Sequence, residues 1–102
     1  VVSKILLLKI RSNIMKELSL HIYMSPFCST CKNVISTIEL LNKIIKNVNF
    51  TIINIHESIS LASDNKVAAI PTTIIYKDKI ETNRFVGAIQ IKTIIEELLS
   101  DI

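Results

Sequence analysis

The chain has 102 residues, a mass of 11.5 kDa and a mean hydropathy of +0.45, with 49% hydrophobic and 21% charged side chains. This length holds one domain, and this composition excludes intrinsic disorder and a fold that depends on several disulfides. The net charge of +3 comes from residues 1–16, which carry four basic side chains and no acidic one, whereas residues 17–102 carry eight basic and nine acidic ones. A positive charge confined to one end is not a binding face, so we expect no nucleic-acid partner.

Residues 1–14 fit the pattern of the remaining chain poorly. Their apolar positions suit either a helix or an edge strand, and we expect them to form a basic N-terminal extension of a domain that spans residues 15–102. Unbroken apolar runs reach only four residues, as at residues 5–8, whereas a membrane span needs about 20. Lys9 and Arg11 interrupt the segment that a signal peptide would keep apolar. We therefore expect a cytoplasmic protein with no membrane partner.

The first half of this domain predicts a βαβ unit. Residues 18–24 alternate apolar and polar side chains, as a strand does, and Ser25 and Pro26 end that pattern. From Ser29 onward, apolar residues recur at helical spacing for about four turns. Residues 50–55 are almost all apolar, and we expect them to form a central strand covered on both faces of the sheet. Two strands joined by such a helix should be parallel.

The second half predicts a short helix followed by a hairpin. Ser58 can cap a helix that runs to about Asn65. Pro71 then forces the residue before it into an extended conformation. Residues 72–77 and 80–86 predict two strands, because only a tight turn separates two segments of strand-like composition.

The end of the chain predicts a last helix. Gly87 ends the hairpin, and apolar residues recur at helical spacing over residues 91–102. The complete order is β-α-β-short α-β-β-α, which belongs to the α/β fold class.

Cys28 and Cys31 stand where the first strand turns into the first helix. A cysteine at a helix N-terminus faces unpaired backbone N–H groups and the positive end of the helix dipole, which favour the thiolate of Cys28. Cys31 lies one turn later on the apolar face, where a shielded thiol can resolve a mixed disulfide. A redox pair is the interpretation we favour over two inert buried side chains or half of a zinc site. Zinc would need more ligands, and His21 and His56 do not have the spacing of a zinc finger.

Three motifs in this order resemble the thioredoxin family. They are FCSTCK at residues 27–32, AIPT at residues 69–72 before the hairpin, and FVGA at residues 85–88 before the last helix. The resemblance covers residues 18–102. It implies a thioredoxin-like fold, in which a mixed four-stranded sheet is sandwiched between helices.

The resemblance also implies how a substrate would bind. Pro71 would be in the cis form and pack against the disulfide, and the backbone of Ile70 would offer strand-like hydrogen bonds to a substrate peptide. Phe27 and Gly87 would complete the substrate-binding residues. No cofactor and no metal ion are implied beyond the redox-active disulfide of Cys28 and Cys31.

The chain also departs from the family pattern. Phe27 replaces the usual Trp, and residues 29–30 are Ser-Thr where thioredoxins usually have Gly-Pro. Ile22 and Ile52 stand where thioredoxins usually bury an Asp and a Lys. The chain is similar in size to glutaredoxins, but residues 86–89 contain a single Gly and no acidic residue, whereas glutaredoxins typically bind glutathione there through Gly-Gly and Asp. We therefore do not expect a glutathione site.

These observations predict a monomeric enzyme that reduces protein disulfides. Cys28 would attack the substrate sulfur, Cys31 would release the product, and an electron donor of the thioredoxin-reductase type would restore the dithiol. The alternatives are a binding module that docks partners at Ile70 and Pro71 with little turnover, and a glutaredoxin-like or metal-holding protein.

Four other polar residues have weaker interpretations. We expect His21 to be half-exposed or hydrogen-bonded within the domain, and Lys32 and Lys66 to be solvated. His56 follows the second strand, at the end of the sheet where Cys28 lies. It either relays a proton to Cys31 in place of the missing carboxylate or is simply exposed, and we favour exposure.

Overall fold

The computed structural model describes residues 17–45 and 48–98. Their elements follow the predicted order, and their bounds are β1 (Leu18–Met24), α2 (Ser29–Ile44), β2 (Val48–Asn54), α3 (Ile59–Asp64), β3 (Thr72–Lys77), β4 (Ile80–Val86) and α4 (Ile91–Leu98). The N-terminal extension predicted for residues 1–14 and the predicted end of the last helix at Ile102 lie outside the described residues.

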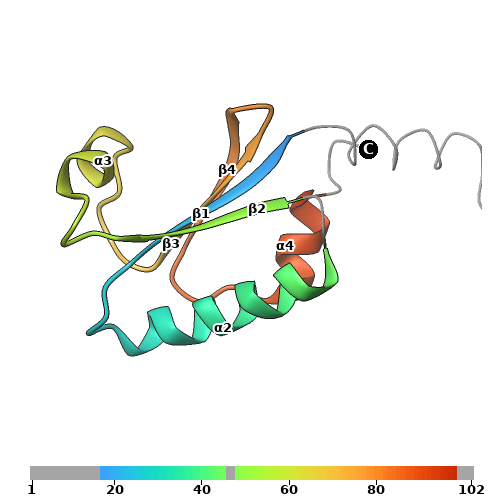
Figure 1. The fold of residues 1–102 in the computed structure, drawn as a ribbon, viewed down its shortest axis with the longest axis horizontal. Helices are drawn as coiled ribbons and strands as arrows, with labels where there is room; N and C mark the ends of the chain where they lie inside the picture. The colour runs from blue at the N-terminus through green and yellow to red at the C-terminus, as the bar shows by residue number, and fades with distance from the viewer. Residues whose placement is uncertain (1–16, 46–47, 99–102) are drawn as a thin grey trace, which may run out of the picture.

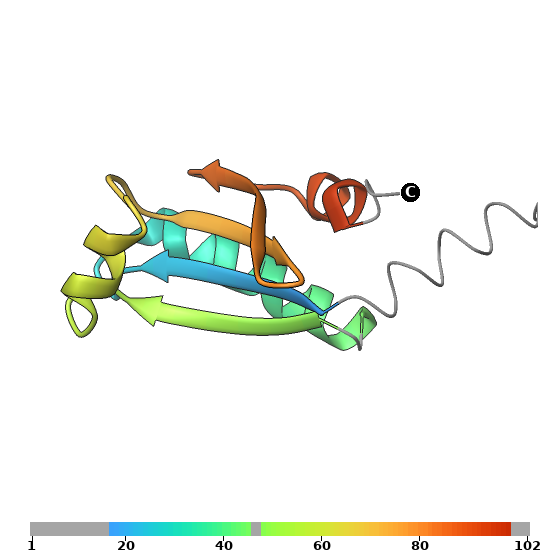
Figure 2. The ribbon, with the colours of Figure 1, turned by 90° about the horizontal axis from the view of Figure 1, so that it is seen from above.

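The four strands form one mixed sheet in the order β2-β1-β3-β4 (Figure 2). The pair β1 and β2 is parallel, as the βαβ pattern predicted, and β3 is antiparallel to both β1 and β4. Helices α2 and α4 cover one face of the sheet, and α3 lies on the opposite side (Figure 1). The predicted sheet between helices is therefore confirmed.

The predicted position of the second strand is wrong. Residues 50–55 were expected at the centre of the sheet, but β2 lies at an edge of the described sheet and runs over Val48–Asn54. Thr51 and Ile52 are exposed, Ile52 by 47%. An apolar run shows that side chains avoid water, but it does not distinguish a central strand from an edge strand whose inner face alone is buried.

The larger of two cores lies between the sheet and helices α2 and α4. Alternate residues of β1 point into this core. They contact the side of α2 on which apolar residues recur every three or four positions. Its buried members are Leu18, Leu20, Ile22, Val34, Ile38, Leu41, Val48, Ile75, Ile94 and Leu98. The smaller core, beneath α3, consists of Tyr23, Ile53, Ala62 and Ile74.

The hairpin turn forms as predicted. Asp78 and Lys79 both adopt positive φ angles, of 52° and 68°, a combination that matches the twist of a two-residue hairpin. The Asp78 carboxylate accepts a hydrogen bond of 2.9 Å from the backbone N–H of Glu17, and the Asp78 N–H donates one of 2.8 Å to the Glu17 carbonyl. The turn is thereby tied to the start of β1.

Ser58 does not cap α3 in the predicted way. It occupies the N-cap position, but its side chain makes no capping hydrogen bond. Another residue holds the opposite end of this helix, because Arg84 donates to the carbonyls of Asn65 and Lys66.

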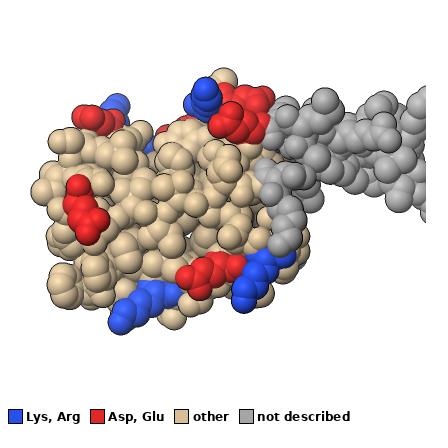
Figure 3. Space-filling model, in the orientation of Figure 1, with Lys and Arg blue, Asp and Glu red and all other residues tan. Residues whose placement is uncertain are grey.

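The charges on the surface are scattered. Lys, Arg, Asp and Glu side chains form small separate groups on the face drawn in Figure 3, and most of that face carries no charge. Among the described residues, no helix is long and apolar enough to cross a membrane.

Candidate functional site

The chain brings four separate segments together at one end of the sheet. The backbone N–H of Ile55, just after β2, donates to the carbonyl of Met24 at the end of β1 over 3.0 Å. Tyr23 pairs with Thr72, the first residue of β3, so Pro71 lies next to the point where β1 ends. The N–H of Gly87, just after β4, donates to the Pro71 carbonyl over 2.8 Å. The loop between β1 and α2, which carries the cysteines, therefore begins at the end of the sheet where the other three segments lie.

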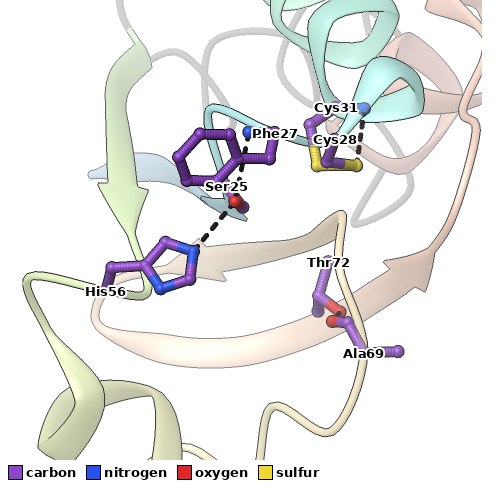
Figure 4. The surroundings of a disulfide bond; sticks show 7 residues. All are labelled: Ser25, Phe27, Cys28, Cys31, His56, Ala69 and Thr72. Carbon is purple, nitrogen blue, oxygen red and sulfur yellow. Dashed lines mark hydrogen bonds between the residues drawn. A yellow bond between two sulfur atoms is a disulfide. The ribbon is translucent and has the colours of Figure 1, made fainter.

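Cys28 is the N-cap residue of α2, as predicted. Its Sγ accepts a hydrogen bond from the Cys31 N–H over 3.1 Å, and the two side chains form a disulfide with their Cα atoms 5.2 Å apart (Figure 4). Cys28 is half-buried, whereas Cys31 is completely buried. A sulfur that accepts a backbone N–H at a helix N-terminus is placed where a thiolate is stabilised.

The loop before β3 carries the predicted cis peptide bond between Ile70 and Pro71. The hydroxyl of Thr72 closes this loop by donating to the Ala69 carbonyl over 2.6 Å (Figure 4). Pro71 is buried and Ile70 is half-buried. Gly87, at the end of the hairpin, has a φ of 88°, which few other residues adopt readily. Pro71 and Gly87, both predicted at the site, are therefore in direct contact.

An apolar hollow of about 420 Å³ adjoins this loop. Its lining includes Ile55, His56, Ile59, Val67, Ala69 and Ile70, and no Lys, Arg, Asp or Glu of the described part of the chain contributes to it. Two apolar side chains nearby are strongly exposed, Phe27 by 89% and Ile59 by 72%. The surface around Ile59 and Ile70 is therefore largely uncharged and apolar.

The thioredoxin family model matches residues 9–100 of the chain. This chain belongs to the thioredoxin family. A crystal structure of Fasciola hepatica thioredoxin is 26% identical in sequence, with a TM-score of 0.76 over 94% of this chain and 91% of that one.

Two further thioredoxins share the fold. Oxidised mitochondrial thioredoxin 3 from Saccharomyces cerevisiae has a TM-score of 0.72 at 24% identity, over 94% of this chain and 90% of that one. A mutant thioredoxin from Halobacterium salinarum has a TM-score of 0.77 at 20% identity, over 98% of this chain and 86% of that one. With its Cys28–Cys31 disulfide at C-x-x-C spacing, this family member is a thiol-disulfide oxidoreductase.

This chain has isoleucine at the two positions where thioredoxins usually bury an Asp and a Lys. Ile22 is completely buried in the larger core, whereas Ile52, its neighbour in the register of β1 and β2, is 47% exposed. The two positions are therefore unequal, because only Ile22 lies in the interior. No carboxylate at either position can accept a proton from Cys31.

His56 is exposed, as favoured from the sequence, and it also has a defined partner. Its Nε2 lies 2.9 Å from the hydroxyl oxygen of Ser25, and its ring meets that of Phe27 edge-on, with the centroids 6.0 Å apart (Figure 4). Sequence reasoning missed Ser25, which is buried at the start of the cysteine loop. Its position directly before Pro26 was the available signal, because Ser often bonds to the backbone of a turn that it begins.

The other polar residues lie away from the cysteine loop or are solvated. His21 is half-buried on the side of the sheet that α3 covers, and its ring packs 4.8 Å from that of Tyr76. Burial lowers the pKa of His21 below its usual value. Lys32 and Lys66 are exposed. The described residues contain no group of three or more His, Cys, Asp and Glu side chains that could hold a metal ion.

Proposed function

We propose that this thioredoxin-family protein is a protein-disulfide reductase. The observation that carries the proposal is the unequal setting of the two cysteines. Cys28 is partly exposed and accepts a backbone N–H at a helix N-terminus, whereas Cys31 is completely buried. This arrangement suits one attacking thiolate and one resolving thiol.

The first step is an attack by the Cys28 thiolate on a disulfide of a client protein. A bond forms between Cys28 Sγ and one client sulfur, and the other client sulfur leaves as a thiolate that takes up a proton. The N–H of Cys31, which points at Cys28 Sγ, favours the attacking thiolate by donating to it.

The second step releases the client. Cys31 loses its proton and attacks Cys28 Sγ, so that the internal disulfide closes and the client leaves with both of its cysteines reduced. Apolar surroundings disfavour a thiolate, and Ile22 supplies no proton acceptor in the core. We therefore expect release to be slower than formation of the mixed disulfide, and to accelerate as the pH rises.

The client binds through apolar contacts and backbone hydrogen bonds. An extended client segment would lie along the backbone of Ile70, with Pro71, Phe27 and Gly87 around the reacting sulfur. The exposed Phe27 ring and the uncharged hollow beside Ile70 support this proposal. Clients with apolar residues near the disulfide would suit this surface better than highly charged ones.

An external donor returns two electrons and two protons to the oxidised pair. We propose a donor of the thioredoxin-reductase type, and a reducing compartment such as the cytoplasm, where a C-x-x-C pair is more often redox-active than structural. A monomer suffices for this cycle, because both reacting sulfurs lie within one chain.

Reduction of insulin by dithiothreitol tests this proposal. The protein should accelerate insulin precipitation well above the rate with dithiothreitol alone, and Cys28→Ser should abolish the acceleration. Phe27→Ala provides a milder variant that should raise KM more than it lowers kcat, because Phe27 contacts the client but takes no part in the chemistry. A wild-type protein that gives no acceleration would indicate a binding module and would contradict the proposal.

A further inference from the structure

We propose that His56 is a positioning residue that acts through Ser25 to hold the loop carrying Phe27 and Cys28. The inference rests on the proposed function in one respect only, that Cys28 is the attacking thiol. It concerns a contact between the segment that follows β2 and the segment that follows β1, two segments 31 residues apart in the chain. The sequence patterns assigned neither residue to this role.

Ser25 organises the loop with its backbone and its side chain together. Its carbonyl accepts the N–H of Cys28 over 3.1 Å, and its hydroxyl oxygen accepts the N–H of Phe27 over 3.2 Å. With Pro26 at the second position, these two bonds close a turn directly before α2. Because Ser25 is only 5% exposed, little water can replace a bond that is lost there.

The bond to His56 fixes the orientation of the Ser25 hydroxyl. A serine hydroxyl has one proton and two lone pairs, and the Phe27 N–H occupies one lone pair. Ser25 can donate its proton to a neutral His56, or its second lone pair can accept the proton of Nε2. Either way the oxygen of Ser25 stays 2.9 Å from Nε2 and remains directed at the Phe27 N–H.

His56 is itself well anchored. Its backbone N–H donates to the side-chain oxygen of Asn54 over 2.9 Å, and the neighbouring Ile55 N–H is bonded to Met24 at the end of β1. Its ring also meets the Phe27 ring edge-on (Figure 4). His56 thus joins the sheet to the turn by two routes, one through Ser25 and one through Phe27.

Loss of this contact should reduce the reactivity of Cys28. Without His56 the Ser25 side chain can adopt other rotamers, in which its hydroxyl oxygen no longer accepts the Phe27 N–H. The turn then holds Cys28 less firmly at the N-cap, where its sulfur accepts the Cys31 N–H. A thiolate that keeps this bond for less of the time is less stabilised.

The rate at which iodoacetamide alkylates Cys28 measures this effect without any client. We would use the full chain in a Cys31→Ser background, so that Cys28 is the one reactive thiol, and compare His56→Ala, Ser25→Ala and the double variant between pH 5 and 9. Each should react about two- to tenfold more slowly at neutral pH, the range expected for one hydrogen bond. The midpoint of the pH profile should rise, and the loss in the double variant should be smaller than the sum of the two single losses, because both single variants remove the same hydrogen bond.

Two further variants distinguish a positioning role of His56 from an unspecific disturbance of the structure. His56→Gln should recover most of the rate, because the amide can donate or accept a hydrogen bond at a similar reach. His21→Ala, which removes the other histidine, in the middle of β1, should react like the parent protein.

A His56→Ala variant that is alkylated at the parental rate would overturn the inference. Strictly additive losses in the double variant would overturn it too, because they would show that the two residues act separately. Should Ser25→Ala fail to fold, the exposed His56 variants decide the question alone. Failure of the proposed function would instead leave these alkylation rates altered while the protein with both cysteines intact shows no insulin reduction.

Discussion

The two faces of the sheet differ in the number of core residues packed against them and in the surface hollows found beside them. The face covered by α2 and α4 buries ten core residues, whereas the face beneath α3 buries four. The side of α3 also contains the apolar hollow beside Ile70 and a second hollow of about 390 Å³, whose lining includes His21, Tyr76 and Lys79. The larger core anchors α2, the helix that follows Cys28, and the smaller core supports the loops at the same end of the sheet.

This difference suggests that the larger core provides most of the stability, whereas the loops beneath α3 provide the surface that recognises clients. Helix α2 is 16 residues long and buries Val34, Ile38 and Leu41 together with Cys31, which is thereby held in the interior. Helix α3 has six residues and buries only Ala62, and the loop that follows it leads to Pro71. The loops beneath α3 can therefore vary with little cost to the fold, whereas changes in the larger core threaten the whole domain.

The largest effect is expected from a charge introduced into the larger core. Ile22→Asp should lower the free energy of unfolding by on the order of 5 kcal/mol at neutral pH, because it removes a buried side chain and leaves a carboxylate without a partner. Ile52→Asp, at the paired position on the edge strand, should cost less than about 1 kcal/mol. Urea unfolding of both variants measures the difference.

The pH dependence of Ile22→Asp provides a second check. Burial raises the pKa of a carboxyl above its unfolded value, so the variant should be most stable at low pH and lose stability as the pH rises through the folded pKa. Equal stability of the two Asp variants would contradict the assignment of β1 to the interior and β2 to the edge.

Removal of apolar atoms should distinguish the two cores directly. Ile38→Ala, in the larger core, should cost about 2–5 kcal/mol. Ile53→Ala, in the smaller core, should cost about 1–2 kcal/mol less, because fewer neighbours lose contacts and the site can collapse more easily. The same denaturation experiment applies, and identical losses would show that the two cores are equally well packed.

A smaller effect is expected where β4 holds the end of α3. Arg84 donates to the carbonyls of Asn65 and Lys66 over 3.1 and 3.3 Å, and it forms two hydrogen bonds with Glu81. Arg84→Gln should cost about 1 kcal/mol and increase hydrogen exchange in residues 65–70. Glu81→Gln is the matched control, since it removes the ion pair but leaves the guanidinium on the two carbonyls. If exchange rises as much in Glu81→Gln, the carbonyl contacts are unimportant.

The ion pair between Arg84 and Glu81 also predicts how the stability of the fold depends on pH. The hydrogen bond from Arg84 lowers the pKa of Glu81 below its ordinary value of 4.5. The stability that it contributes is therefore present above pH 4.5 and is lost as the pH falls through the lowered pKa. In Arg84→Gln, this loss of stability at low pH should disappear from the curve of unfolding free energy against pH.

The smallest expected effect is that of His21. Because burial lowers its pKa below 6.5, protonation favours the unfolded chain, and stability should fall as the pH drops below that value. His21→Gln should flatten the stability curve between pH 6.5 and the lowered pKa. A curve that His21→Gln leaves unchanged would show that this side of the sheet hydrates the histidine well.

The order of the elements and the cysteine site could be predicted because local signals coincide there. The period of apolar residues changes from two to three or four at Ser29, where α2 begins, and Cys28 and Cys31 fall on either side of that change. Pro71 restricts the backbone, and Gly87 allows a positive φ that other residues rarely adopt, so both residues mark the loops on which they lie.

The position of β2 and the role of Ser25 could not be predicted in the same way. The apolar run that includes Ile52 is compatible with an edge or a centre, and only the pairing of all strands decides between them. The bond between Ser25 and His56 joins residues that are 31 positions apart. No local pattern encodes such a contact, since it depends on how β1 and β2 end side by side.

The most direct test of the unequal roles of the two cysteines is the capture of clients as mixed disulfides. Cys31→Ser should accumulate clients bonded to Cys28, because the attack occurs and the release does not, whereas Cys28→Ser should capture almost none. Non-reducing gels followed by mass spectrometry of the linked peptides identify the sulfur in each bond. Equal capture by the two variants, or links formed mainly through Cys31, would contradict the account.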